Sequence, residues 1–261
     1  MQRASIPPVV LIIAGNDPTG GAGLAADIQA VSALGAHPAP VAAVLTVQDT
    51  RDVSRVEPVD PVLVAEQADA VLADLPVAAV KLGLLASAAV GRAVAALLRA
   101  HPKLPLVVDP VLKAGGGEIL AEEALIEVYR REIFPRATLI TPNAAESRRF
   151  IPGTSDATAL GAALLALGAA HVLIKGADEA TPAVRNLFMS ADGSRQEFTW
   201  PRLPGVYHGS GCTLASAAAA LLALGETPAA AVSRAQDYTW KALQAGMPLG
   251  RGQFIPRRFP A

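Results

Sequence analysis

Val9-Val10-Leu11-Ile12-Ile13-Ala14-Gly15 begins the segment from which the fold class can be predicted. A continuous apolar run of this kind is typical of a strand that is buried on both faces in a parallel sheet. The turn-forming residues 16–23 follow it, and residues 24–34 then carry apolar side chains at helical spacing, with Gly35 in place to end the helix. The stretch therefore predicts a strand, a glycine-rich loop and a helix.

The same alternation continues along the chain. Further strands are expected at 41–47, 78–82, 104–108, 137–140 and 171–174, and a hairpin is expected around Asp192-Gly193 within 184–200. Helices are expected at 61–75, 88–100, 122–131, 158–167, 214–224 and 229–245. Strands that alternate with helices predict an α/β fold, with a mostly parallel central sheet covered by helices on both faces.

The composition narrows the possible partners. The chain has 261 residues, 52% of them apolar and 17% charged, with a net charge of −1, so we expect neither a nucleic-acid nor a membrane partner. No apolar run reaches the roughly 20 residues that span a bilayer, and no signal peptide is expected before the first strand. A single cysteine fits a reducing compartment, and a cytoplasmic location is expected.

A second glycine-rich stretch, His208-Gly209-Ser210-Gly211-Cys212-Thr213, precedes the apolar helix expected at 214–224. Glycines let backbone N–H groups approach a ligand, and the start of a helix attracts negative charge, so this stretch predicts an anion site, most plausibly for phosphate. Cys212 lies where the helix dipole is expected to lower a thiol pKa below about 8.5. A proton acceptor beside an anion site suits phosphoryl transfer to a hydroxyl. On this stretch alone, close packing of small residues remains an alternative.

Other polar residues follow the expected strands, and ligands of parallel sheets bind at the carboxyl ends of the strands. Carboxylates there suit Mg²⁺, and a lysine suits a phosphate. Any one of these residues also fits a turn, a helix surface or a solvated charge, so the prediction depends on their common position. The residues are 15–23, Gln48, Asp109, Asn143, Glu146, Lys175 and 209–212.

Several motifs together resemble one family. They are 15–23 with Ala26-Asp27, 32–36, Lys81-Leu82-Gly83, Asp109-Pro110-Val111, Thr141-Pro142-Asn143 with Glu146, Lys175-Gly176 and 208–213. The chain resembles, from about residue 9 to residue 246, the hydroxymethylpyrimidine/phosphomethylpyrimidine kinases of the ribokinase-like superfamily. The resemblance implies a three-layer αβα sandwich forming a single ribokinase-like kinase domain over 1–261, and a homodimer. It also implies ATP, Mg²⁺ and two successive phosphorylations of 4-amino-5-hydroxymethyl-2-methylpyrimidine.

The resemblance also implies a role for individual residues. Cys212 matches the catalytic base, and Gly209 and Gly211 match the anion hole. Gln48 matches the glutamine that binds the aminopyrimidine, and Ala22 and Gly23 match the pyrimidine side of the pocket. The nucleotide and metal residues implied are Lys175 and Asn143 for ATP and its phosphates, and Asp109 and Glu146 for Mg²⁺.

Some positions depart from the family pattern. Asp49 replaces an asparagine and puts a negative charge near the substrate, Leu84 replaces a methionine, and Tyr207 replaces a threonine. Ala177-Asp178 replace a Gly-His pair. Lys113 stands where an apolar residue is usual, in a glycine-rich segment, 113–117, that is expected to be a mobile flap closing over nucleotide.

Three alternatives remain open from sequence. A pyridoxal or pyridoxine kinase of the same superfamily would act on a similar flat ring with a hydroxymethyl group. Gly21-x-Gly23-x-x-Ala26 with Asp49 partly matches a dinucleotide-binding fingerprint, although 16–19 intervene after the strand. The third alternative is a non-catalytic protein of the same fold that binds the pyrimidine.

Overall fold

A computed structural model of the protein describes residues 6–112 and 122–259. Within these residues one sheet holds nine strands in the order β3-β2-β1-β4-β5-β6-β7-β8-β9. The strands are β1 (Val9–Asn16), β2 (His37–Gln48), β3 (Val53–Pro58), β4 (Val77–Leu82), β5 (Leu106–Val108), β6 (Leu139–Ile140), β7 (His171–Ile174), β8 (Ala183–Ser190) and β9 (Arg195–Pro201). The strands from β2 to β7 in this order run parallel, whereas β3, β8 and β9 are antiparallel additions at the two ends.

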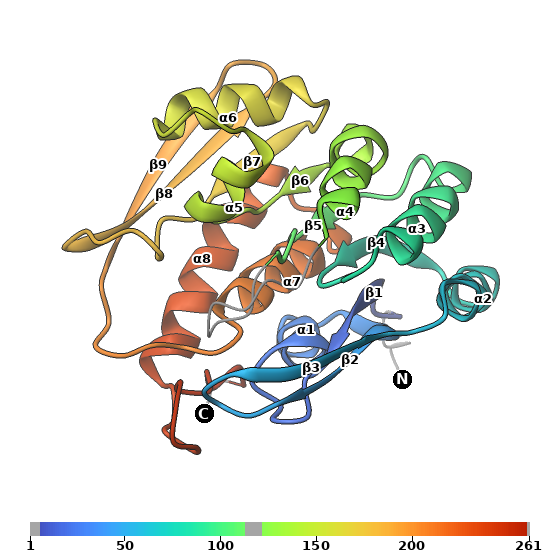
Figure 1. Ribbon diagram of the computed structural model, residues 1–261, viewed down its shortest axis with the longest axis horizontal. Coiled ribbons are helices and arrows are strands. Elements are labelled where there is room, and N and C mark those ends of the chain that lie inside the picture. The colour runs from blue at the N-terminus through green and yellow to red at the C-terminus, as the bar shows by residue number, and fades with distance from the viewer. Residues whose placement is uncertain (1–5, 113–121, 260–261) are drawn as a thin grey trace, which may run out of the picture.

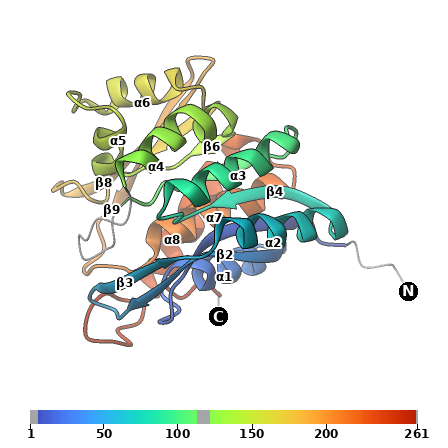
Figure 2. The ribbon, with the colours of Figure 1, turned by 45° about the vertical axis from the view of Figure 1, so that its right-hand side comes forward.

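Helices cover both faces of the sheet, as Figures 1 and 2 show. One face carries α1 (Gly23–Ala33), α7 (Ser210–Ala223) and α8 (Pro228–Gln244). The other face carries α2 (Pro61–Asp74), α3 (Ala88–Ala100), α4 (Glu123–Val128), α5 (Ala144–Phe150) and α6 (Ala157–Ala166). The predicted three-layer αβα sandwich with a mostly parallel sheet is confirmed.

The side chains of β1 explain the two layers. Val10 and Ile12 pack into the core with α7 and α8, whereas Leu11 and Ile13 pack into the core on the side of α2 and α3. Successive residues of a strand point to opposite faces, so a strand covered on both sides must be apolar throughout. The continuous apolar run in the sequence therefore follows from the central position of β1.

Two elements were not expected. β3 is one, and it has only one buried residue, Val53, because it lies at the edge of the sheet. The other is α5, a helix of two turns that begins with a capping box between Asn143 and Glu146. The helix expected at 122–131 is α4 followed by a π-helical turn, Tyr129–Ile133.

The carboxyl ends of the parallel strands meet at one edge of the sheet. β1 ends at Asn16, β2 at Gln48 and β7 at Ile174, just before Lys175, while β5 leads directly into Asp109. The N-terminus of α7 comes to the same edge. The topology thus brings together segments that are up to about 200 residues apart in the sequence.

Candidate active site

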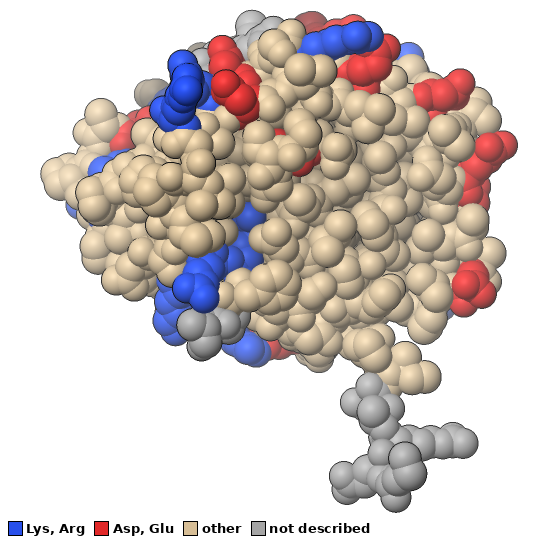
Figure 3. Space-filling view, turned by 90° about the horizontal axis from the view of Figure 1, so that it is seen from below, with Lys and Arg blue, Asp and Glu red and all other residues tan. Residues whose placement is uncertain are grey.

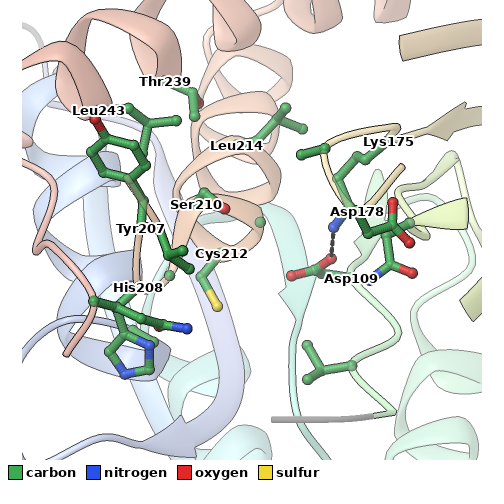
Figure 4. A pocket seen from close by; sticks show the side chains of 18 of the residues that line it. Asp109, Lys175, Asp178, Tyr207, His208, Ser210, Cys212, Leu214, Thr239 and Leu243 are labelled. Atoms are coloured by element: carbon green, nitrogen blue, oxygen red, sulfur yellow. Dashed lines mark hydrogen bonds and ion pairs between the residues drawn. The ribbon is translucent and has the colours of Figure 1, made fainter. Parts of the chain in front are cut away.

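One cavity of about 600 Å³ lies at this edge. Every site residue predicted from the sequence lines it, namely Ala22, Gly23, Gln48, Asp109, Asn143, Glu146, Lys175, Gly209, Gly211 and Cys212. Figure 4 shows how α7 and the Asp109–Lys175 pair face each other across the cavity, with the Cys212 sulfur pointing into the space between them. The flap predicted at 113–117, with Lys113, lies outside the described residues.

The predicted anion site is the N-terminus of α7. Gly209 is the N-cap and has a left-handed backbone (φ +69°), which favours glycine. A Cβ atom on Gly209 would collide with the carbonyl oxygen of Gly21, so the two glycine loops are in direct contact. A Cβ atom on Gly211 would lie 2.9 Å from the Lys175 Nζ and 3.4 Å from an Asp109 oxygen. Glycine is therefore required at Gly209 for contact between the two loops, whereas Gly211 lets α7 approach the side chains of Lys175 and Asp109 closely.

Cys212 lies in the first turn of α7, as predicted, but the predicted low pKa is wrong. Burial raises the pKa of its thiol to about 11, although the Lys81 ammonium and a hydrogen bond from the Gly23 N–H both act in the opposite direction. Asp27 and Asp109 raise it further. Burial is the largest of these effects, so the thiol holds its proton at neutral pH in this state of the site.

A buried ion pair lies next to Cys212. The Lys81 Nζ is 2.8 and 2.7 Å from the two carboxylate oxygens of Asp27, the Ser216 hydroxyl donates to the same carboxylate, and neither charged side chain is exposed. Burial disfavours a charged Lys81, but Asp27, Cys212 and Asp109 together outweigh that effect and hold the Lys81 pKa above its usual value. Both residues belong to the sequence motifs, but no role was predicted for either. The signal in the sequence is Lys81 itself, a charged residue in the otherwise apolar strand β4.

On the other side of the cavity Asp109 binds Lys175. The Lys175 Nζ donates to Asp109 Oδ1 at 2.7 Å, and the Thr141 hydroxyl donates to the same oxygen at 3.2 Å. Both charged side chains are largely buried. Lys175 has two further N–H donors. Among the described residues they have no acceptor, so they can meet a phosphate at the cavity surface.

Glu146 and Asn143 form the capping box of α5. The Asn143 side chain accepts from the Glu146 N–H at 2.7 Å, and the Glu146 carboxylate accepts from the Asn143 N–H at 2.8 Å. Burial raises the pKa of Glu146 to about 7, against the pull of Lys175. A buried carboxylate beside Asp109 is a costly arrangement that a cation would relieve.

The donor set fits a magnesium ion that keeps most of its waters. Mg²⁺ is commonly held by one or two carboxylates together with substrate phosphates, rather than by a complete protein cage. Asp109 and Glu146 supply two carboxylates, and within 6–112 and 122–259 no group of three or more His, Cys, Asp or Glu side chains could hold a metal. These two residues would therefore hold the ion only in company with bound phosphates.

The opposite end of the cavity is shaped by β2. Thr46 and Gln48 point inward on alternate positions; the Thr46 hydroxyl donates to the Asn16 carbonyl at 2.8 Å and accepts from Gln48 Nε2 at 2.6 Å. This pairing fixes the amide of Gln48, which lines the cavity. Leu84 lies close to Gly15 on the same wall. A flat ring with a polar edge fits between these groups.

Asp49 does not place its charge in this cavity. Its carboxylate accepts hydrogen bonds from the Arg51 and Asp52 N–H groups in the turn between β2 and β3, and these bonds lower its pKa. Asp49 is therefore a turn former. Likewise Asp178 accepts from the Ala144 and Ala145 N–H groups and ties the loop after β7 to the start of α5.

The remaining part of the cavity lies between β8, β9 and α8. Its lining includes Val184, Leu203, Thr239 and Leu243. Beneath them Gln236 Oε1 accepts from Asn186 Nδ2 at 2.8 Å and from the Trp200 indole N–H at 3.3 Å. An apolar slot of this kind, in the same cavity as Lys175, suits a nucleotide base.

Comparison with known proteins decides the family. The family model described as phosphomethylpyrimidine kinase matches residues 17–256. The chain belongs to the phosphomethylpyrimidine kinase family. Family membership makes it a phosphotransferase and removes the dinucleotide alternative, in agreement with the role of Asp49 in a turn. Among the helices described, none combines the length and apolar character that crossing a membrane requires.

Two curated relatives show how much of the chain is shared. The chain is 42% identical over 258 residues to the thiamine biosynthesis bifunctional protein ThiED of Geobacter sulfurreducens, covering 96% of this chain and 52% of that protein. It is 39% identical over 254 residues to hydroxymethylpyrimidine/phosphomethylpyrimidine kinase of Streptomyces coelicolor, covering 94% of this chain and 92% of the other. The chain thus spans about half the length of the first relative and nearly all of the second.

Solved structures share the fold. Pyridoxal kinase from Staphylococcus aureus in complex with ADP has a TM-score of 0.87 at 25% identity, covering 97% of this chain and 94% of the other. Phosphomethylpyrimidine kinase from Clostridium difficile 630 has a TM-score of 0.76 at 30% identity, and the match covers 90% of this chain and 100% of the other. The ribokinase-like fold predicted for this chain is therefore confirmed.

The buried carboxylate of Glu146 predicts a pH-dependent stability. Its pKa in the folded chain, about 7, lies above the ordinary value of 4.5, so the folded state binds this proton more tightly and loses stability as the pH rises through that interval. Between about pH 5 and about pH 8, the wild type should lose on the order of 1–3 kcal/mol of unfolding free energy relative to Glu146→Gln. Urea denaturation at the two pH values measures the difference.

Glu123→Gln is the matched control, because Glu123 is exposed on α4. It should follow the wild-type pH dependence. Added Mg²⁺ at about pH 8 should stabilise the wild type more than Glu146→Gln. Parallel pH curves for the wild type and Glu146→Gln would contradict the assignment.

Proposed function

We propose that the protein transfers the γ-phosphoryl group of ATP to the hydroxymethyl group of 4-amino-5-hydroxymethyl-2-methylpyrimidine, and then phosphorylates the monophosphate to the diphosphate. The observation that carries the proposal is that Gln48 and the N-terminus of α7 line one cavity with Lys175 and Asp109. The end of the cavity at β2 suits a polar flat ring, and the end between β8, β9 and α8 suits a nucleotide. The names of both curated relatives support the same activity.

In this proposal the residues divide the chemistry among them. The substrate hydroxyl oxygen attacks the γ-phosphorus, the bond to the β-phosphate oxygen breaks, and ADP leaves. The N–H groups at 209–212 stabilise the charge on the transferred group, since preorganised donors at a helix start serve that purpose without reorganising. Lys175 and Asn143 serve the nucleotide phosphates, and Ala22 and Gly23 border the pyrimidine. The hydroxyl proton goes to the thiolate form of Cys212, which is a minor species at neutral pH because the pKa of the thiol is raised.

Magnesium belongs to the proposal as well. Held near Asp109 and Glu146, it would neutralise phosphate charge during transfer. Independently of the ion, Asp109 orients Lys175 by their 2.7 Å ion pair, and the capping box fixes Glu146. We also propose that residues 1–261 act as one ribokinase-like kinase domain.

Gln48→Ala should damage pyrimidine binding selectively. The substitution leaves the polar edge of the ring without its partner in a desolvated pocket, which costs about 1–3 kcal/mol, or roughly one to two orders of magnitude in affinity. ATP affinity should stay close to that of the wild type, since Gln48 lies at the other end of the cavity from Val184 and Leu243. Calorimetry with each ligand measures both. Normal pyrimidine binding by the variant would remove Gln48 from the site.

A pyridoxal kinase is the second candidate, favoured by the similarity in fold to the Staphylococcus aureus enzyme. Both substrates carry a hydroxymethyl group on a flat heteroaromatic ring. A comparison of kcat/KM for the pyrimidine alcohol and for pyridoxal under the same conditions separates the two. The proposed function requires the higher value for the pyrimidine.

We also propose a homodimer in the cytoplasm. Leu45 and Val47 alternate with Thr46 and Gln48 on β2, so they point away from the cavity, and their exposed fractions are 50% and 57%. Figure 3 shows the side of the molecule on which β2, β3 and α1 lie, and its centre is largely free of charged side chains. A second copy on this face would cover the apolar residues. Sedimentation equilibrium should give a dimer mass; a monomer mass would refute the proposal.

A further inference from the structure

Arg258 is a buried arginine within the last residues of the chain. Its side chain is among the largest that are fully buried, with 1% exposed. Its Nε donates to the Thr213 hydroxyl at 2.8 Å, and its two terminal nitrogens donate to oxygens of Gly20, Gly21 and Gln29. The acceptors are neutral oxygens, and two of them are backbone carbonyls of the first glycine loop. Desolvating a guanidinium is costly, so this placement needs a compensating role.

The segment 247–258 reaches this position by pairing with several parts of the active-site edge. The Phe254 N–H donates to Val206, and the His208 N–H donates to Phe254, at 2.8 and 2.9 Å. The Gln253 N–H donates to the Thr50 carbonyl at 2.7 Å in the turn between β2 and β3. Figure 1 shows the C-terminal segment beside the β2–β3 end of the molecule. The segment is therefore built into the site.

The two glycine loops are joined at two further points. The His208 ring lies 2.9 Å from an Asp17 carboxylate oxygen, and that carboxylate accepts from the Thr19 and Ala22 N–H groups. Gly209 packs directly on Gly21. Arg258 completes this junction, because its terminal nitrogen would lie 2.9 Å from a Cβ atom on Gly209 while it binds the Gly21 carbonyl.

We infer that Arg258 is a positioning residue for phosphoryl transfer. It holds the loop 16–23 in a fixed position relative to the anion site at the N-terminus of α7. The inference rests on the proposed function. The relative position of the two loops matters because the Gly23 N–H donates a hydrogen bond to Cys212, and because Gly209 and Gly21 leave no space between the loops. The fork of the guanidinium reaches Thr213 on α7 and the loop at the same time, which a single ammonium group cannot do.

Kinetics of Arg258→Lys and Arg258→Ala test the inference. A displacement of about 1 Å in an active site can cost about 10²-fold in rate, so kcat for the folded variants should fall by about that factor. KM for ATP should change much less, since the part of the cavity proposed for the nucleotide base lies between β8, β9 and α8. Guanidinium ions in the assay should restore part of the activity of Arg258→Ala. The matched control is Arg257→Ala, which removes an exposed arginine one position earlier and should behave as the wild type.

Hydrogen–deuterium exchange of residues 16–23 gives a second measurement that does not depend on the reaction. In Arg258→Lys these amides should exchange at least several-fold faster than in the wild type and in Arg257→Ala, while those of β1 stay protected. Unchanged exchange, or an unchanged kcat in a folded Arg258 variant, would overturn the inference. A wild type that does not phosphorylate the pyrimidine would refute the proposed function and leave the exchange result to decide the role of Arg258.

Discussion

Cys212→Ser should lower kcat by about 10²- to 10⁴-fold while nucleotide affinity stays nearly constant. That range is typical for the loss of a general base, and the variant keeps the backbone N–H groups of the anion site. Cys212→Asp should recover part of the rate, because a carboxylate is ionised at neutral pH and can accept the proton. Steady-state rates and ADP affinity of the three proteins measure the effect.

The pH dependence of kcat/KM tests the role of Cys212 as a base more specifically. Burial puts the thiol pKa at about 11, so the reactive thiolate is a small fraction at neutral pH and increases with pH. The wild-type kcat/KM should therefore rise by about tenfold per unit through neutral and mildly alkaline pH, whereas Cys212→Asp should be flat there. If Cys212→Ser turns over like the wild type, Cys212 serves packing alone, and only the backbone anion site remains.

Lys81→Met should produce the largest loss of stability. It leaves Asp27 buried without its ion-pair partner, and breaking such a pair from one side typically costs about 3–5 kcal/mol. Urea denaturation measures the unfolding free energy. The cost should appear because neither side chain is exposed, so water cannot replace the lost contacts.

Two controls make this prediction specific. Lys241→Met breaks an exposed ion pair with Asp237 on α8 and should cost less than about 1 kcal/mol. The double variant Asp27→Asn with Lys81→Met removes both charges and should regain much of the stability lost by Lys81→Met alone. A cost for Lys81→Met no larger than that of Lys241→Met would show that the buried pair is not a stabilising unit.

The sequence predicts those parts of the fold that depend on local pattern. The run at 9–14 predicts β1 because a strand covered on both sides must be apolar, and Asp192-Gly193 predicts the β8–β9 hairpin because that turn needs a glycine. β3 escaped prediction because only Val53 of its residues is buried, so its sequence lacks the apolar alternation. α5 is too short for a periodic pattern, although Asn143 and Glu146 have the spacing of a capping box.

The site follows the same division. Its residues could be predicted because the carboxyl ends of parallel strands meet at one edge of the sheet. A residue that directly follows a predicted strand is therefore expected at that edge. The pKa of Cys212 could not, since it depends on burial and on Asp27, Lys81 and Asp109, which only the folded chain brings together. Arg258 was missed for a related reason: its partners at Gly20 and Gly21 lie at the other end of the sequence.

Release of ADP from ATP is the decisive measurement of pyrimidine phosphorylation by this protein. With Mg²⁺ present, ADP should appear in equal amount to the pyrimidine alcohol consumed, and again when the pyrimidine monophosphate is the only acceptor. The product of the second reaction should be the diphosphate. ADP release no faster than with ATP alone, in a protein that still binds ATP and the pyrimidine, would refute the proposed activity.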